Sequence, residues 1–227
     1  MILVKITFLG QAGLLFETAD CKVMVDPYLS DSVAKVNPAN WRRVPVDARF
    51  FDIRPDVLIF THDHLDHFDP ETVSVLLQRH KDITVLAPSS VWGKVRQMAP
   101  DNNYVLFDRF TRWTQQAIRF EAVKAQHSDA HAIGVIISYK QKKYYITGDT
   151  LYSKEVLSDL PKDLDVVFLP VNGKGNNMNM DDGADFFRAT GAKVAVPVHT
   201  GLFDALDAND FSVENKVIPE IYKEIKL

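Results

Sequence analysis

The sequence predicts an α/β (α+β) fold in which short strands and short helices form two halves of similar plan. Apolar runs rich in β-branched and aromatic side chains recur along the chain and indicate strands. Helical segments lie between some of these runs, so that the order is β-rich, then α/β, then β-rich, then α/β. No Gly/Ser-rich or Pro-rich linker separates the halves. We therefore expect residues 1–227 to form one domain.

The first half is expected to begin with three strands joined by tight turns, the first marked by Gly10 and Gly13. A long polar stretch over residues 30–52 follows, and loops of that length inside a compact domain are usually functional or mobile. Asp69 is the expected N-cap of a helix that has Pro70 at its first position. The expected strands are 4–9, 14–17, 22–25, 56–60 and 83–87, and the expected helices are 70–77 and 91–98.

The second half is expected to open with β structure between residues 104 and 145 and to end with alternating helices and strands. The expected strands are 105–107, 117–123, 133–139, 143–146, 166–170 and 194–198, and the expected helices are 152–160 and 181–190.

Composition excludes several classes of protein. The chain has 26 basic and 30 acidic side chains, and its net charge of −4 implies no polycationic face for nucleic acid. Cys21 is the single cysteine, which excludes an intramolecular disulfide and fits a cytoplasmic location. The apolar run Met1–Phe8 lacks a basic leader and a cleavage site, so we expect a first strand and not a signal peptide. No run approaches the roughly 18 apolar residues that a membrane span requires.

The most informative feature is the cluster His62-Asp63-His64-Leu65-Asp66-His67, which follows the apolar run 57–60. Imidazole and carboxylate are side chains that Zn²⁺, Mn²⁺ and Fe²⁺ accept as ligands. A protein core has little use for so many adjacent polar groups, because each one needs a partner when it is buried. The cluster therefore predicts a metal site above the end of a strand, and a metal-dependent hydrolase is the first interpretation.

Three further candidate ligands, His127, Asp149 and His199, also follow apolar runs that are expected to be strands. One polar residue at the end of one strand would mean little, but four such ends can converge on one cleft. His131 lies four residues beyond His127 and is the alternative ligand from that segment. We favour His127 because it lies at the strand end.

The pattern H-x-H-x-D-H with later His, Asp and His residues resembles the signature of the metallo-β-lactamase superfamily. Within it, the chain is most similar to the L-ascorbate-6-phosphate lactonase-like branch of metal-dependent hydrolases. The resemblance implies a four-layer αββα sandwich with its metal site at one edge of the two sheets. It rests on the segments Asp26–Ser30, Thr61–Asp69, His127–Gly134 and Pro197–Phe203.

The resemblance also implies a role for each candidate ligand and one or two divalent ions, Zn²⁺, Mn²⁺ or Fe²⁺. Asp66 and Asp149 are the implied catalytic residues, Asp149 as a bridge between two ions and Asp66 as a group that orients the attacking water or takes its proton. Two ions would bind and acidify that water. The first ion would be held by His62, His64 and His127, and the second by Asp66, His67 and His199.

Four more residues are candidates for positioning or substrate contact. Asp26 could orient a metal-bound histidine, although Asp-Pro is also a common end to a strand. The polar loop 172–179 could cradle a phosphate or sugar with its backbone N–H groups and Lys174, with Asn176 beside it, or be a plain surface loop. His131 could support the site or contact the substrate.

The expected activity is hydrolysis of a small polar molecule, with a lactone or related ester first among substrates. One alternative is a phosphodiesterase or nuclease that uses the same two-metal site. The other is a non-hydrolytic metal-binding protein. No nucleic-acid or membrane partner is expected, and the resembled enzymes suggest assembly into a homo-oligomer.

Overall fold

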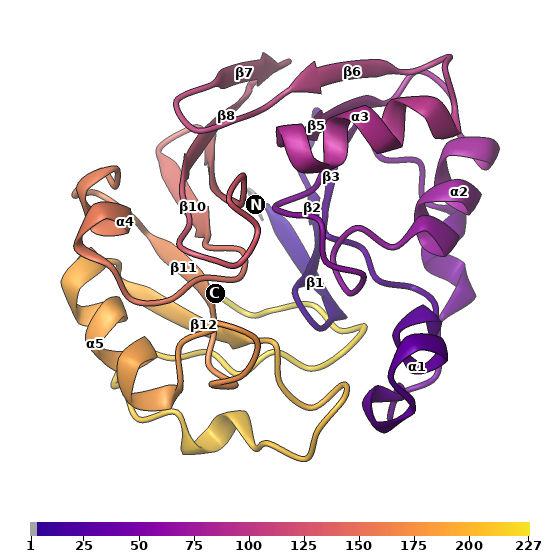
Figure 1. Ribbon diagram of the computed structural model, residues 1–227. Coiled ribbons are helices and arrows are strands. Elements are labelled where there is room, and N and C mark those ends of the chain that lie inside the picture. The colour runs from indigo at the N-terminus through magenta and orange to yellow at the C-terminus, as the bar shows by residue number, and fades with distance from the viewer. Residues whose placement is uncertain (1–3) are drawn as a thin grey trace.

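The computed structural model describes residues 4–227, in which two six-stranded sheets pack face to face (Figure 1). In the first sheet the strands follow one another in chain order. The pairs β1–β2 and β2–β3 are antiparallel, and every pair from β3 to β6 is parallel. The strands are β1 (Lys5–Gly10), β2 (Gly13–Glu17), β3 (Lys22–Val25), β4 (Val57–Ile59), β5 (Thr84–Ala87) and β6 (Asn103–Leu106).

The second sheet repeats this plan in the order β12-β11-β10-β9-β8-β7. Its pairs from β7 to β10 are antiparallel, whereas β10–β11 and β11–β12 are parallel. Each sheet therefore joins an antiparallel part to a parallel part. The strands are β7 (Arg112–Gln115), β8 (Ile118–Lys124), β9 (Ile133–Tyr139), β10 (Lys142–Ile146), β11 (Val166–Pro170) and β12 (Val194–Val198).

Helices cover the outer face of each sheet (Figure 1). The first sheet carries α2 (Pro70–Arg79) and α3 (Ser89–Met98), and the second carries α4 (Lys154–Ser158) and α5 (Met180–Thr190). Asp69 caps α2 as expected, because its carboxylate accepts hydrogen bonds from the backbone N–H groups of Glu71 and Thr72. The four layers are helix, sheet, sheet and helix, which confirms the predicted αββα sandwich.

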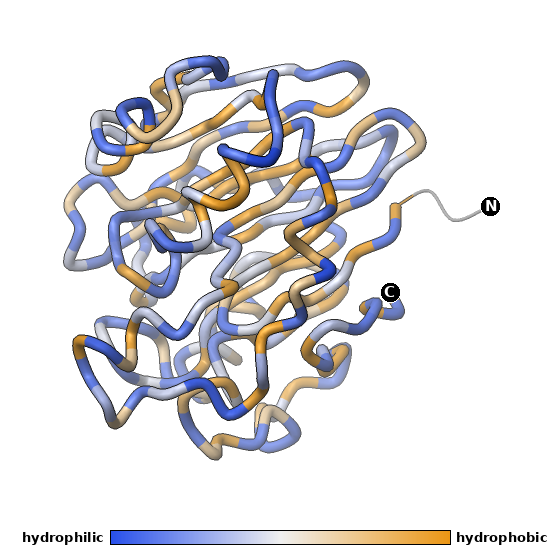
Figure 2. Tube along the Cα trace, turned by 90° about the vertical axis from the view of Figure 1, so that its right-hand side faces the viewer, coloured by the Kyte–Doolittle hydropathy of each residue, from blue (hydrophilic) through white to orange (hydrophobic). Residues whose placement is uncertain are grey.

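Successive side chains of a strand point to opposite faces of its sheet, so the buried apolar side chains form three layers: one between the sheets and one under the helices on each outer face. In β4, Val57 and Ile59 belong to the cluster between the sheets, whereas Leu58 packs under α2 and α3. In β11, Phe168 faces the first sheet while Val167 packs under α4 and α5. Figure 2 shows the apolar strands inside and hydrophilic segments around them. Burial on both faces explains why these strands are continuous apolar runs.

The structure adds elements that the sequence did not indicate. The segment 30–52 contains the short helix α1 (Ser32–Val36) and two 3₁₀ helices, Pro38–Asn40 and Ala48–Asp52. β7 was not expected, because this edge strand is only half-buried and its sequence Arg-Trp-Thr-Gln lacks an apolar run. A third 3₁₀ helix, Ala208–Asp210, lies near the C-terminal end.

The expected helices and strands are all present, with ends that differ by a few residues. Met1–Leu3, part of the apolar run expected to start the first strand, lie outside the described residues. β6 belongs to the first sheet, where it pairs with β5, and so closes the first half instead of opening the second. Within residues 4–227, no helix is long and apolar enough to cross a membrane.

Asp165 ties together the beginnings of three strands in the second sheet. Its carboxylate is 5% exposed and accepts hydrogen bonds from the backbone N–H of Lys143 (2.9 Å) and from the ammonium groups of Lys142 (3.0 Å) and Lys193 (2.8 Å). Burial raises the pKa of Asp165, but these hydrogen bonds outweigh burial and lower the pKa to about 2.

Replacing this carboxylate should change how stability depends on pH. A lowered carboxyl pKa stabilises the fold above the unfolded value of about 3.9, and the contribution disappears as the pH falls toward 2. We expect Asp165→Asn to lower the free energy of unfolding at pH 7 by about 2 kcal/mol and to weaken the acid dependence between pH 4 and 2. Urea unfolding at several pH values measures both. Parallel pH profiles for the two proteins would contradict this role.

Candidate metal centre

Polar side chains follow the strands whose carboxyl ends meet at one edge of the sandwich. Asp26 comes directly after β3, and His62, Asp149 and His199 come after β4, β10 and β12. The two sheets are joined at this edge, where the backbone N–H of Ile133 donates to the carbonyl of Thr61 (3.0 Å). Parallel strands bring their carboxyl ends together, so residues far apart in sequence converge here.

Seven side chains form two adjacent clusters of potential metal ligands. In each cluster the ligand atoms lie within 4.8 Å of one another. Asp149 spans both clusters, because its Oδ1 lies 3.2 Å from His67 Nε2 and its Oδ2 lies 3.2 Å from His199 Nε2. The structure thus brings together all the ligands that the sequence suggested. The first cluster contains His62, His64, His127 and Asp149, and the second contains Asp66, His67 and His199.

The first cluster contains two buried polar atoms that make no hydrogen bond among the described residues, His62 Nε2 and Asp149 Oδ1, and of these Asp149 Oδ1 has only the ion-pair contact with His67. An unsatisfied buried polar group costs about 1–3 kcal/mol. A bound cation would satisfy both atoms, since each has a lone pair directed into the cluster. Imidazole and carboxylate donors fit Zn²⁺, Mn²⁺ and Fe²⁺.

Each histidine of the two clusters turns one ring nitrogen toward the other ligands and the second nitrogen toward a fixed partner. Such outer partners hold the ring orientation and the tautomer of a metal ligand. The partners are Thr61 Oγ1 for His62 (3.0 Å), Ser128 Oγ for His64 (3.2 Å), Asp26 Oδ2 for His67 (2.8 Å), the Asn176 carbonyl for His127 (3.3 Å) and the Asn172 amide for His199 (3.0 Å).

The orientation of the Asn172 amide follows from this pattern. Asn172 Nδ2 lies 3.0 Å from His199 Nδ1, and Asn172 Oδ1 is buried without a partner. If His199 presents its Nε2 lone pair to the cluster, its Nδ1 carries the proton and needs an acceptor. Turning the amide over supplies that acceptor, so we assign Asn172 Oδ1 to His199 Nδ1.

Asp26 holds two of the ligands from behind. Its fully buried carboxylate accepts hydrogen bonds from the backbone N–H of Thr61 (2.8 Å), from Thr61 Oγ1 (2.5 Å) and from His67 Nδ1 (2.8 Å). Because Thr61 Oγ1 also contacts His62, the same carboxylate supports one histidine of each cluster. These contacts are the ones that the positioning role predicted for Asp26 would need.

The two clusters differ in charge. Burial and the neighbouring His67 lower the pKa of His62 well below its ordinary value, and burial likewise lowers the pKa of His127. Burial alone would also lower the pKa values of His67 and His199. The carboxylates of Asp149 and Asp66 outweigh burial, so the pKa of His67 lies well above its ordinary value and the pKa of His199 rises to about 9. His62 and His127 of the first cluster are therefore neutral imidazoles, the form that binds metals, whereas His67 and His199 of the second cluster form ion pairs with Asp66 and Asp149.

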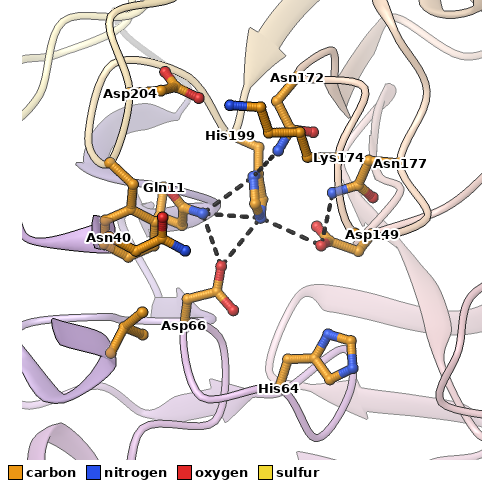
Figure 3. Close-up of a pocket in the computed structure, with 13 residues that line it drawn as sticks. Gln11, Asn40, His64, Asp66, Asp149, Asn172, Lys174, Asn177, His199 and Asp204 are labelled. Atoms are coloured by element: carbon orange, nitrogen blue, oxygen red, sulfur yellow. Dashed lines mark hydrogen bonds and ion pairs between the residues drawn. The ribbon is translucent and has the colours of Figure 1, made fainter. Parts of the chain in front are cut away.

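A polar cavity of about 210 Å³ opens onto the clusters (Figure 3). Of the residues suggested for substrate contact, Lys174 lines this cavity. Asn176 contributes its backbone carbonyl to His127 and does not line it. His131 lies exposed at the surface, where its Nδ1 is 3.0 Å from Ser89 Oγ, and does not line the cavity either. The lining also includes Gln11, Asn40, Asn172, Asn177 and Asp204.

Several residues of the site were not recognised in the sequence. Thr61 and Ser128 are next to predicted ligands in the sequence, and this adjacency is the feature that could have identified them. Asn177 lies in the polar loop and donates to Asp149 Oδ2 (2.8 Å). Gln11 is 2% exposed in the β1–β2 turn, and its signal was a polar side chain between two glycines in an otherwise apolar stretch.

A two-sheet sandwich with histidines and aspartates gathered at one edge defines a metallo-β-lactamase fold. Residues 22–200 match the family model of a beta-lactamase superfamily domain, and the chain belongs to the metallo-β-lactamase superfamily. The narrower resemblance to the L-ascorbate-6-phosphate lactonase-like branch stays a prediction.

Curated relatives and solved structures resemble the chain over nearly its full length. A UPF0173 protein of Pyrococcus furiosus is 25% identical over 222 residues, covering 92% of this chain and 90% of the relative. A UPF0173 metal-dependent hydrolase of Ligilactobacillus salivarius is 28% identical over 235 residues, covering 96% and 94%. A metallo hydrolase of Ignicoccus hospitalis shares the fold, with a TM-score of 0.78, 18% identity and 97% of each chain covered.

Loss of the Asp26 carboxylate should weaken metal binding. In Asp26→Asn, an amide N–H₂ can replace the oxygen that accepts from His67, so the ring loses its acceptor. Loss of such an outer partner typically costs about 10–100-fold in metal affinity. Competition with a chromogenic chelator measures the affinity.

Asp69→Asn is the matched control, because Asp69 is also a fully buried aspartate but caps α2 and contacts no ligand. It should lower stability and leave metal affinity unchanged. Wild-type affinity in Asp26→Asn, or equal losses in both variants, would show that Asp26 does not position His67.

Proposed function

We propose that the protein is a metal-dependent hydrolase that acts on a small polar molecule, with a lactone or related ester first among substrates. The observation that carries this proposal is that members of both clusters line the cavity, namely His64, Asp66, Asp149 and His199. A molecule that enters the cavity would meet the candidate metal ligands directly. The similarity to metal-dependent hydrolases supports the same class of reaction.

The walls of the cavity favour a polar substrate of modest size. Its volume of about 210 Å³ is below the range of about 300–1,000 Å³ that is typical of drug-sized ligands. Amide side chains from Gln11, Asn40, Asn172 and Asn177 line it, and such groups donate to and accept from hydroxyl and carbonyl oxygens. Lys174 lines the same cavity and would favour a substrate with a negative charge.

The protein's own residues would hold the catalytic groups in place and move protons. When bound, divalent ions would supply an acidified water and would polarise the carbonyl oxygen of the acyl group that the water attacks. Asp66 is the ligand carboxylate with the larger exposure, 18% against 5% for Asp149, and would take the proton of that water. The water oxygen would add to the acyl carbon, the C–O bond to the leaving oxygen would break, and that oxygen would receive the proton that Asp66 took from the water. Asn177 holds Asp149 through the hydrogen bond to Oδ2.

The charge around the cavity argues against a polynucleotide substrate. Lys174 is the one lysine or arginine among the described residues that line it, and Asp204 lines it as well. A nuclease would need several cations along a groove to neutralise phosphates.

The single cysteine, Cys21, supports the proposed cytoplasmic location. Assembly into a homo-oligomer stays a prediction.

The substrate class is tested with metal-loaded protein and two panels, lactones with related esters and generic phosphodiesters. We expect turnover of lactones or esters. His64→Ala and Asp149→Ala should reduce this turnover by more than about 100-fold, because losing a metal ligand should cost more than losing a residue that only supports a ligand. Both residues follow strand ends, so circular dichroism should show folded variants.

His80→Ala is the control, because His80 follows the C-terminal end of α2 and its Nε2 contacts the carbonyl of Phe51 (2.8 Å). It should keep wild-type turnover. Hydrolysis of the phosphodiester panel alone would replace the lactone assignment by the phosphodiesterase alternative. Full activity in His64→Ala or Asp149→Ala would contradict the site.

A further inference from the structure

Gln11 lies against the second cluster and contacts two of its members. Its buried side chain donates from Nε2 to Asp66 Oδ2 (2.7 Å), and Nε2 lies 3.0 Å from both ring nitrogens of His199 (Figure 3). Its backbone carbonyl accepts the backbone N–H of His199 (2.7 Å). The amide is thus held beside the atoms that would bind the second ion.

The hydrogen bonding of the two clusters is unequal. In the first, His62 Nε2 and Asp149 Oδ1 are buried without a hydrogen bond among the described residues, although Asp149 Oδ1 lies 3.2 Å from His67 Nε2 of the second cluster. In the second, Asp66 Oδ2 is 2.7 Å from the Gln11 amide and 3.2 Å from His199 Nε2. His67 Nε2 lies 3.4 Å from His199 Nε2. Ligands also contact one another in the first cluster, where His127 Nε2 lies 3.1 Å from His64 Nδ1. Asn177 donates to Asp149 Oδ2 there but leaves Oδ1 without a hydrogen bond among the described residues. The second cluster differs in that the Gln11 amide already donates to the ligand oxygen Asp66 Oδ2.

We propose that the two clusters bind divalent ions with unequal affinity and that Gln11 lowers the affinity of the second. This rests on the proposed metal-dependent function. An ion entering the first cluster relieves unsatisfied atoms, whereas an ion entering the second competes with the Gln11 amide for an Asp66 lone pair. The amide also turns the positive end of its N–H dipole toward the second cluster. The first cluster fills first, and Gln11 determines whether one or two ions are bound at a given concentration.

The test is calorimetric titration of metal-free protein with Mn²⁺, with bound metal counted by mass spectrometry. Wild type should bind one ion tightly and a second at least about tenfold more weakly, as expected for displacing a hydrogen bond to a charged group. Gln11→Gly and Gln11→Ala should tighten the second ion by about tenfold and leave the first unchanged. Gly suits the backbone here, because Gln11 has φ +54°, and both variants keep the carbonyl that accepts from His199.

Two further variants separate the role of the amide from a general effect of the cavity. Gln11→Glu replaces the donor by a carboxylate beside Asp66, so it should tighten the second ion at least as much as Gln11→Gly does. Asn40→Ala is the control, because Asn40 lines the same cavity and its side chain makes no hydrogen bond with either cluster in the described part of the chain. It should leave both affinities unchanged.

Three results would overturn the proposal. Equal affinity for two ions in wild type would show that the clusters do not differ, and would leave the proposed hydrolase function standing. Weaker binding of the second ion in Gln11→Gly would show that Gln11 supports this site instead of competing for it. A wild type that binds no Mn²⁺ and no Zn²⁺ would overturn the proposed function together with this inference.

Discussion

The geometry of the metal centre depends on the buried carboxylate of Asp26. Three hydrogen bonds from Thr61 and His67 converge on it, so the end of β3, the end of β4 and one ligand of the second cluster are held as one unit. A buried carboxylate is costly unless it is fully paired, and these donors pair it. Through Thr61 it also supports His62, which extends the same support to the first cluster.

The sandwich brings the remaining ligands to this unit. Packing between the two sheets sets the positions of β4, β10 and β12, and the bond from Ile133 to Thr61 joins the sheets at the edge where these strands end. Gly148 is needed at this edge, because it has φ +60° and a Cβ there would meet the Ile133 carbonyl and the Thr61 side chain at 2.9 Å. Asp149 follows directly, so the close approach of the sheets places its carboxylate between the two clusters.

The fold and the seven candidate ligands could be predicted from the sequence, because both depend on local patterns. Buried strands are visible as continuous apolar runs, and each ligand follows such a run or belongs to the cluster from His62 to His67. The supporting groups depend on tertiary contacts instead. Gln11 meets His199 across 188 positions of sequence, and no local pattern connects them. β7 was missed because an edge strand does not need apolar side chains.

The central claim is that these clusters hold divalent metal. Crystals grown with Mn²⁺ or Zn²⁺ and measured on both sides of the absorption edge of the metal would locate the ions by anomalous scattering. We expect an anomalous peak in contact with His62 Nε2 and Asp149 Oδ1, the two atoms of the first cluster that make no hydrogen bond among the described residues. Peaks confined to surface carboxylates, with those two atoms still unpaired, would contradict the account.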